Sequence, residues 1–153
     1  MRTLNLPRYS FKIKSIQDSD HIFDPLRKKY VKLTPEEWVR QNFVQFLISD
    51  KGFPGGRIVI EKSLSYNKMI KRCDILAYGE SMDPLLIVEC KAPEVKIKKE
   101  IFDQIAVYNM NFKLKYLIVT NGLAHYFCTV DFENRKVKFL NRIPDYRELS
   151  GLK

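Results

Sequence analysis

The chain has 153 residues, which is enough for one domain of the usual size of about 150 residues and too few for a multidomain machine. Apolar residues make up 45% of the chain and charged residues 29%, and this ordinary globular composition excludes wholesale disorder. The longest apolar runs, 85–88 and 116–119, are far shorter than a membrane span, and the N-terminus lacks the apolar stretch of a secretory signal. We therefore expect a single cytoplasmic domain over residues 1–153, with no membrane partner.

The net charge is the first indication of a partner. Lysine and arginine together number 27 against 18 aspartates and glutamates, which gives a net charge of +9. Such a balance favours a polyanionic partner such as nucleic acid, and the alternative is a soluble basic protein without one. The cysteines Cys73, Cys90 and Cys128 show no CxxC spacing, so neither a disulfide framework nor a zinc site is expected.

The N-terminal part of the chain predicts two short strands. Phe11 and Ile13 alternate with polar residues, so residues 9–16 are expected to form a strand. Residues 17–20 are expected to form a turn and residues 30–33 a second strand, with the basic run 27–29 in the loop between the strands.

The first clear helix begins at Thr34. Threonine is a good N-cap, Pro35 suits the first helical position, and Glu37 stands three residues after the cap, where it completes a capping box. Apolar residues then recur at helical spacing up to about Ser49, and they form one face made of Val39, Phe43, Phe46 and Leu47. The glycine- and proline-rich stretch 52–56 ends this helix.

The rest of the chain contains strands and one further helix. The helix is expected over 98–110, with one side made of Ile97, Ile101, Ile105 and Tyr108. Strands are expected over 57–61, 72–78, 85–91, 116–120, 125–130 and 136–143. A loop over 79–84 joins two of them, and Asn121-Gly122 is a strong turn signal. This order predicts an α/β domain with a mixed central β-sheet flanked by helices.

Two acidic residues, Asp74 and Glu89, stand in otherwise apolar strands. If the loop over 79–84 joins its strands as a symmetric hairpin, Asp74 lies opposite Glu89, and Arg72 lies opposite Lys91. Directly opposed residues share a face of the sheet with their Cβ atoms about 5 Å apart, and Lys91 points to the same face as Glu89. One patch would then hold two carboxylates and an ammonium group.

Such a patch suggests a specific chemistry. Two neighbouring carboxylates repel each other unless a cation lies between them, and hard oxygen ligands suit Mg²⁺, with Mn²⁺ as a substitute. A neighbouring lysine can orient or deprotonate a water molecule, or it can stabilise developing negative charge. The pattern favours a phosphodiester hydrolysis site, and the alternative is that these acids near strand ends have no catalytic role.

At these residues the chain resembles a known nuclease family. The segments 72–78 and 85–93 resemble the core of PD-(D/E)xK nucleases, and more narrowly the N-terminal nuclease domain of type I restriction enzyme R subunits. Further similarity lies at 34–41, at 102–109, which resembles a glutamine-tyrosine motif, and at 120–122. The resemblance covers residues 23–130 and implies a restriction-endonuclease-like fold whose nuclease core spans residues 34–130.

The resemblance also implies roles for individual residues. Asp74 and Glu89 would bind Mg²⁺, and the backbone carbonyl of Cys90 would be a third protein ligand. Lys91 would act on the attacking water, and one acid of the first helix would support the metal shell.

Two further assignments are less direct. Glu36 lies seven residues before Phe43 and therefore only about 20° from it on the inward face, whereas Glu37 is explained by the capping box, so we favour Glu36 as the helix acid. By resemblance, Gln104 and Tyr108 would order the active site or contact the DNA backbone. Gln104 lies on the apolar side of its predicted helix, where a polar side chain needs a partner, and the alternative is a simple hydrogen bond to the backbone.

Basic residues lie close in sequence to the predicted site. They can contact phosphates before and after the acidic strands, at Lys62, Lys68, Lys71, Arg72, Lys96, Lys98 and Lys99. The alternative for each is a solvated side chain. The sequence contains no motif for base readout, so no recognition sequence is predicted.

Together these features predict a Mg²⁺-dependent DNA endonuclease. The chain contains no GxxxxGK[ST] phosphate loop, so we do not expect a complete R subunit with its motor. It is either free-standing or dependent on a motor or specificity subunit that brings it DNA, and a homodimer would suit a double-strand cut. Two alternatives stay open on the same scaffold, a non-catalytic nucleic-acid-binding module and a subunit-interaction module.

Overall fold

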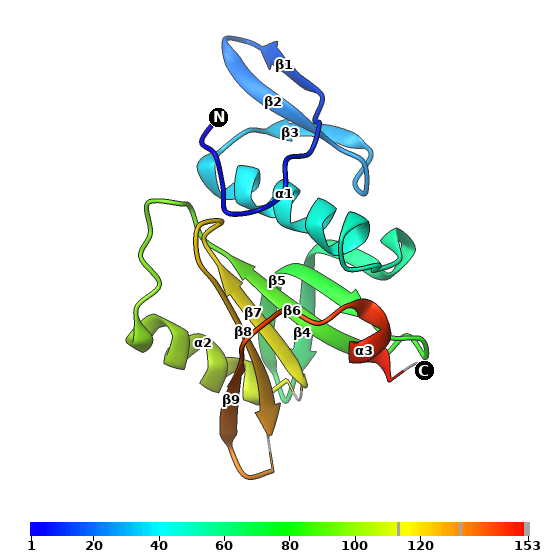
Figure 1. The fold of residues 1–153 in the computed structure, drawn as a ribbon, viewed down its shortest axis with the longest axis vertical. Helices are drawn as coiled ribbons and strands as arrows, with labels where there is room; N and C mark the ends of the chain where they lie inside the picture. The colour runs from blue at the N-terminus through cyan, green and yellow to red at the C-terminus, as the bar shows by residue number, and fades with distance from the viewer. Residues whose placement is uncertain (113, 132, 152–153) are drawn as a thin grey trace.

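The structure is a computed structural model that describes residues 1–112, 114–131 and 133–151. Its strands form two sheets, in the orders β1-β2-β3 and β4-β5-β6-β7-β8-β9 (Figure 1). The elements are β1 (Ile13–Ile16), β2 (Ser19–Asp24), β3 (Lys29–Lys32), α1 (Pro35–Ser49), the 3₁₀ turn η1 (Gly55–Arg57), β4 (Ile58–Tyr66), β5 (Met69–Tyr78), β6 (Pro84–Cys90), α2 (Lys99–Met110), β7 (Tyr116–Thr120), β8 (His125–Asp131), β9 (Lys136–Leu140) and α3 (Tyr146–Ser150). Within the described residues, no helix is long and apolar enough to cross a membrane.

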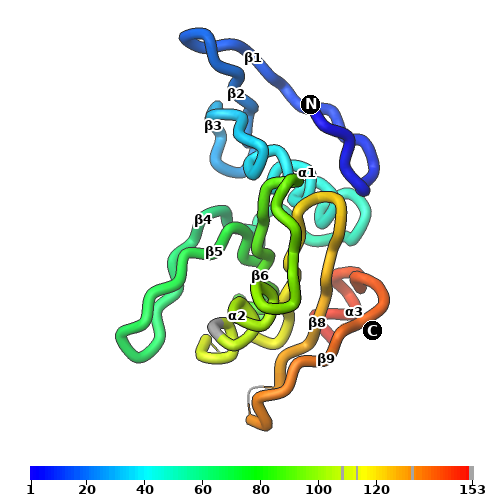
Figure 2. The backbone as a smooth tube through the Cα atoms, turned by 90° about the vertical axis from the view of Figure 1, so that its left-hand side faces the viewer, coloured from blue at the N-terminus to red at the C-terminus, as the bar shows by residue number. Residues whose placement is uncertain are grey.

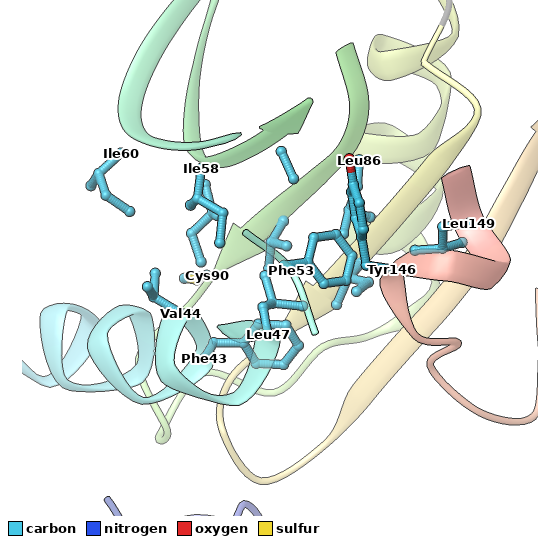
Figure 3. Close-up of a cluster of buried hydrophobic side chains, with 14 of the residues drawn as sticks. Phe43, Val44, Leu47, Phe53, Ile58, Ile60, Leu86, Cys90, Tyr146 and Leu149 are labelled. Carbon is cyan, nitrogen blue, oxygen red and sulfur yellow. The ribbon is translucent and has the colours of Figure 1, made fainter. Parts of the chain in front are cut away.

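The larger sheet is mixed. Its neighbouring strands run antiparallel except β6 and β7, which are parallel and are connected through α2, as a parallel pair requires a crossover. Phe43 and Leu47 of α1 and Tyr146 of α3 belong to a buried cluster on one face, which Figure 3 shows in close-up. Phe102 and Ala106 of α2 belong to a second cluster on the other face. The predicted α/β class, with a mixed central sheet flanked by helices, is confirmed.

The smaller sheet lies beside α1, apart from the central sheet (Figure 2). β1 begins at Ile13, later than the predicted strand over 9–16, and the predicted turn over 17–20 is too long because β2 begins at Ser19. β2 was not predicted, because one of its buried positions is the carboxylate Asp24, which interrupts the apolar alternation of a strand.

α1 begins at the predicted Thr34 cap, whose Oγ1 accepts a hydrogen bond from the Glu37 N–H at 3.0 Å. The second hydrogen bond of the predicted capping box, from the Thr34 backbone N–H to the Glu37 carboxylate, is wrong. The Glu37 carboxylate instead accepts hydrogen bonds from Arg27 Nη2 at 2.9 Å and from Gln41 Nε2 at 3.1 Å. Because Glu37 is only 6% exposed, a guanidinium compensates its charge better than a backbone N–H would.

β5 and β6 pair in the predicted register from Ile75–Val88 to Ala77–Leu86. The hairpin is not symmetric, because the register shifts after Ala77 and Tyr78 lies opposite Pro84. The predicted pairing of Arg72 with Lys91 is wrong. β6 ends one residue before Lys91, whose backbone N–H donates a hydrogen bond to the Thr120 carbonyl of β7 at 2.8 Å. At Lys91 the backbone therefore forms its hydrogen bond with β7 and does not pair with β5.

α2 presents a different face to the sheet from the one predicted. Phe102 and Ala106 are buried, whereas Ile101 and Ile105 are only half-buried. Burying the aromatic ring removes more apolar surface from water than burying a further isoleucine, so the inward face is turned by one residue, about 100°. Gln104 is exposed, and the expectation that it lies on the inward side is wrong.

The N-terminal segment lies against the turn between β7 and β8. The Asn5 N–H donates a hydrogen bond to the Gly122 carbonyl at 2.8 Å, and the Asn5 carbonyl is 2.8 Å from His125 Nε2. Gly122 adopts φ +84°, and a Cβ added there would lie 2.7 Å from Leu4 Cδ2. The predicted turn therefore needs glycine both for its backbone angle and for the close approach of Leu4.

Candidate active site

Two acidic residues from separate elements, Glu36 and Glu89, are both within electrostatic reach of Asp74 and Lys91. Glu36 lies in the first turn of α1, Asp74 in β5 and Glu89 in β6, and Lys91 follows β6. Burial raises the pKa of Glu36, the negative charge of Asp74 raises it further, and Lys91 lowers it. These effects place Asp74 and Lys91 within electrostatic reach of Glu36.

The Asp74 side chain is held by the neighbouring strand. Its Oδ2 accepts a hydrogen bond from the backbone N–H of Cys90 at 2.7 Å. This bond joins β5 to β6 just beyond Ile75 and Val88, the last of their paired residues. The Asp74 carboxylate is thereby fixed beside β6, where its negative charge also acts on Glu89.

Glu89 is only 7% exposed, and a lysine from β5 compensates its charge. The Nζ of Lys71 forms an ion pair with Oε1 of Glu89, and both side chains are largely buried. Burial raises the pKa of Glu89 and the charge of Asp74 adds to this, whereas Lys71 and Lys91 lower it. Lys71 was predicted among the surface lysines that contact phosphates, but it is an internal partner of a candidate metal ligand.

A network of alternating charges lies behind this cluster. It connects the β2–β3 turn to α1, β4 and β5 through Asp24, Arg27, Glu37, Arg40, Glu61 and Arg72. Arg27 lies 2.9 Å from Glu37 and 3.3 Å from Glu61, and Arg40 lies 2.9 Å from Glu61. Glu37 is thus engaged by arginines, and the acid of α1 that faces Asp74 is Glu36.

The other predicted site residues are mostly exposed. Exposed side chains are those of Arg72, Lys96, Lys98, Lys99 and Gln104. The Arg72 guanidinium lies 2.7 Å from Glu61, so its charge is partly engaged. Tyr108 belongs to α2, and its side chain lies outside what the structure describes.

The donor set of the site fits a hard divalent cation. Among the described residues, no three histidine, cysteine or acidic side chains are grouped for metal binding. Mg²⁺ does not need three, because one or two carboxylates with waters and substrate phosphates complete its shell, so Asp74 and Glu89 are suitable. Burial raises the pKa of the Cys90 thiol well above its ordinary value, which leaves the backbone carbonyl of Cys90 as its only suitable donor.

The fold and this cluster define a small α/β domain with an acidic site, partly balanced by lysines, at the end of a central strand. A family model described as Type I restriction enzyme R protein N terminus (HSDR_N) matches residues 35–144, which is most of the chain. The chain belongs to this family.

Among solved structures, a fragment described as an HsdR subunit of a type I restriction enzyme from Vibrio vulnificus YJ016 is 19% identical, with a TM-score of 0.45. The match covers 72% of this chain and 24% of that one, so the chain spans about a quarter of the length of that fragment. No curated protein matches the chain.

Proposed function

We propose that the chain is a Mg²⁺-dependent DNA endonuclease that hydrolyses phosphodiester bonds. The observation that carries this proposal is the position of Asp74, whose carboxylate is fixed to β6 through the Cys90 N–H. From there its charge acts on Glu36 of α1 and on Glu89 of β6, and the charge of Lys91 acts on the same two acids. Burial and the charge of Asp74 raise the pKa of Glu36 and of Glu89. A bound cation would relieve this like-charge repulsion, and carboxylates with perturbed pKa values are concentrated at functional sites. The relationship to the type I restriction R protein and the mixed sheet support a restriction-endonuclease-like nuclease of the PD-(D/E)xK kind.

In this proposal each residue of the cluster has a distinct role. Asp74 and Glu89 hold Mg²⁺, for which Mn²⁺ can substitute, together with the backbone carbonyl of Cys90, and Glu36 supports the shell through water. Bound metal polarises a phosphoryl oxygen and lowers the pKa of its water. The Lys91 ammonium orients the attacking water or stabilises the charge that develops on the phosphate.

DNA as the substrate is supported by charge. The net charge is +9, and exposed basic residues follow the candidate site at Lys96, Lys98 and Lys99, with Arg72 on β5. These side chains are proposed to contact phosphates, which positions a duplex without reading its bases. Gln104 and Tyr108 of α2 are proposed to contact the same backbone or to order the site.

The family relationship supports a role in restriction–modification. We propose that a motor or specificity subunit delivers DNA to this chain in the cytoplasm. A homodimer would provide two active sites for a double-strand cut.

The test is calorimetric titration of Mn²⁺ and Mg²⁺ into the wild type and Asp74→Asn, followed by plasmid nicking with the same samples. Asparagine keeps an oxygen that can accept the Cys90 N–H bond, so the variant removes the charge and preserves the strand contact. We expect saturable metal binding and metal-dependent nicking in the wild type, and a loss of nicking of about a hundredfold or more in the variant. Asp103→Asn, at an exposed acid of α2, is the matched control and should keep both properties.

The outcomes separate the proposal from its alternatives. Absence of saturable metal binding, with or without added DNA, would overturn the nuclease proposal. If salt-dependent DNA binding then persists, the chain is a non-catalytic nucleic-acid-binding module. If DNA binding is also absent, a subunit-interaction module is the remaining function.

A further inference from the structure

The sheet β1-β2-β3 has a second basic surface, and it lies outside the residues 35–144 that the family model matches. In an antiparallel sheet, directly opposed residues share a face, so the pairing register defines the members of each face. Lys14 lies opposite His21, and His21 lies opposite Lys32. These three residues form one row across the sheet.

A second row runs beside the first. The Phe23 N–H donates a hydrogen bond to the Lys12 carbonyl at 2.9 Å, and Phe23 lies opposite Tyr30. Phe23 is two residues after His21, and Tyr30 is two residues before Lys32, so both rows share one face of the sheet. We call this face, made of the two rows, the outer face.

The outer face points away from α1. On the other face of β2, Ile22 and Asp24 are buried, and Phe11 packs against Trp38 of α1 with ring centroids 5.3 Å apart. The lysines of the outer face, Lys12, Lys14 and Lys32, are exposed. Neither row contains an acidic residue, so nothing within the rows neutralises this positive charge.

Aromatic rings hold two of the lysines in place. The Lys14 Nζ lies 4.0 Å from the Tyr30 ring centroid, and the Lys12 Nζ lies 5.8 Å from that of Phe23. The two rings are themselves in contact, with centroids 5.3 Å apart. Ammonium groups that are already positioned lose less conformational freedom when they bind an anion, so the outer face is preorganised for a ligand with several negative charges.

The small sheet has a fixed position next to the candidate active site. Arg27, in the turn between β2 and β3, contacts Glu37 of α1 and Glu61 of β4. Glu36, next to Glu37, belongs to the acidic cluster. The small sheet therefore lies beside the helix that carries Glu36 (Figure 2). A DNA duplex is long and regularly charged, so one bound on the outer face can extend past the edge of the sheet toward the candidate site.

We propose that the outer face binds the phosphate backbone of duplex DNA and docks the duplex beside the active site. The inference rests on the proposed function only in its choice of DNA as the polyanion, and it does not require cleavage. Because the contacts are to phosphates, binding there is independent of sequence and depends steeply on salt.

The experiment measures fluorescence anisotropy of a short DNA duplex of mixed sequence, in EDTA and over a range of salt concentrations. The test variant combines Lys12→Gln, Lys14→Gln and Lys32→Gln. The matched control combines Arg135→Gln, Lys136→Gln and Lys138→Gln, which remove the same charge from exposed positions in and beside β9, at the opposite end of the molecule (Figure 1). Thermal unfolding of both variants checks that they fold.

We expect the test variant to bind DNA about tenfold more weakly or worse, with a salt slope smaller by about three, one unit for each lysine. The control should stay within about twofold of the wild type, because charge away from the docking face acts only through screened long-range attraction. Equal losses in both variants, or unchanged binding in the test variant, would overturn the proposal. Binding to phosphatidylserine vesicles with none to DNA would also overturn it.

Plasmid nicking by the same variants separates this proposal from the nuclease proposal. If the wild type binds DNA through the outer face but never nicks, docking stands and the nuclease proposal fails. If the test variant nicks as fast as the wild type at saturating protein and more slowly at low protein, both stand.

Discussion

Glu36 and Glu37 are adjacent in α1, but their carboxylates have different surroundings. Glu37 is buried against Arg27, which compensates its charge. The Glu36 side chain is 46% exposed, and its Oε1 lies 3.8 Å from Arg40 Nη2. Burial and the negative charge of Asp74 nevertheless raise its pKa. The first carboxylate therefore contributes to the stability of the fold, and the second is held in an environment that favours its protonated form.

Glu36→Gln is expected to stabilise the metal-free protein at neutral pH and to have no such effect well below the ordinary pKa of 4.5. Because the folded-state pKa is raised, the folded chain binds the proton more tightly, so stability falls as pH rises from the unfolded pKa to the folded pKa. Glutamine removes that loss, and solvent screening of the half-exposed side chain keeps the gain below about 0.5 kcal/mol. Thermal unfolding in EDTA across this pH range measures it, and an equal effect at low and neutral pH would contradict it.

Lys71→Met is expected to lower the free energy of unfolding by about 2–4 kcal/mol in EDTA at neutral pH, because it leaves the buried Glu89 carboxylate without its cation. If Mg²⁺ binds at Glu89, it should restore more stability in this variant than in the wild type. Urea unfolding with and without Mg²⁺ measures both effects. Lys62→Met, at an exposed position of β4, is the control, and equal restoration in the wild type and Lys71→Met would count against the metal site.

At the scale of elements, the helical periodicity of α1 and the continuous apolar run of β7 made both elements predictable from sequence almost to the residue. Weak periodicity concealed β2, whose alternation Asp24 interrupts, and the five-residue α3, which is too short for a pattern. β4 runs to Tyr66, past the predicted end at 61, because its outer half is polar and exposed. The bounds of β2, β4 and α3 depend on which residues pack against other elements, and a single sequence does not show that packing.

The same limits explain which parts of the candidate site were predictable. The β5–β6 register followed from the loop between the strands, which placed Asp74 beside Glu89. The Lys71–Glu89 ion pair was not predictable, because β5 was expected to begin at 72, which left Lys71 outside the strand. A start at Met69 would have placed Lys71 in the same strand as Asp74.

Arg27→Leu is expected to destabilise the protein by about 3 kcal/mol or more, because buried Asp24 and Glu37 lose their shared guanidinium. Arg27→Lys should lower the free energy of unfolding by an intermediate amount. The ammonium keeps the positive charge, but it cannot donate hydrogen bonds to several carboxylates at once as the planar guanidinium does. Urea unfolding measures the losses, and hydrogen exchange in β1, β2 and β3 measures local opening. Faster exchange confined to this sheet would show that Arg27 anchors it. Unchanged exchange rates in this sheet would contradict that role.

At the scale of the whole molecule, the N-terminal segment connects distant parts of the chain. Asn5 bonds to Gly122 and is close to His125, at the two sides of the β7–β8 turn. Trp38 Nε1 of α1 donates a hydrogen bond to the Arg2 carbonyl at 2.8 Å. The first residues of the chain therefore tie α1 to the β7–β8 turn of the central sheet.

Gly122→Ala is expected to cost about 2–4 kcal/mol, from about 1–2 kcal/mol of strain at φ +84° and from the contact of the new Cβ with Leu4. In a Leu4→Ala background the contact with Leu4 is relieved, and the backbone strain and the 3.2 Å approach to Val39 Cγ2 remain. A double-mutant cycle by urea unfolding isolates the difference. Additive effects of the two substitutions would show that Leu4 does not press on the turn.

The position of Arg27 has a practical consequence for recombinant work on this protein. A piece trimmed to the family match would begin at residue 35 and would keep Glu37 and Glu61 while discarding Arg27 and the Thr34 cap. It would also uncover the side of α1 on which Phe11 and the small sheet rest. Such a piece should express poorly or aggregate. If it shows no activity in an assay, the cause would be the loss of residues 1–34 and not the absence of a working active site.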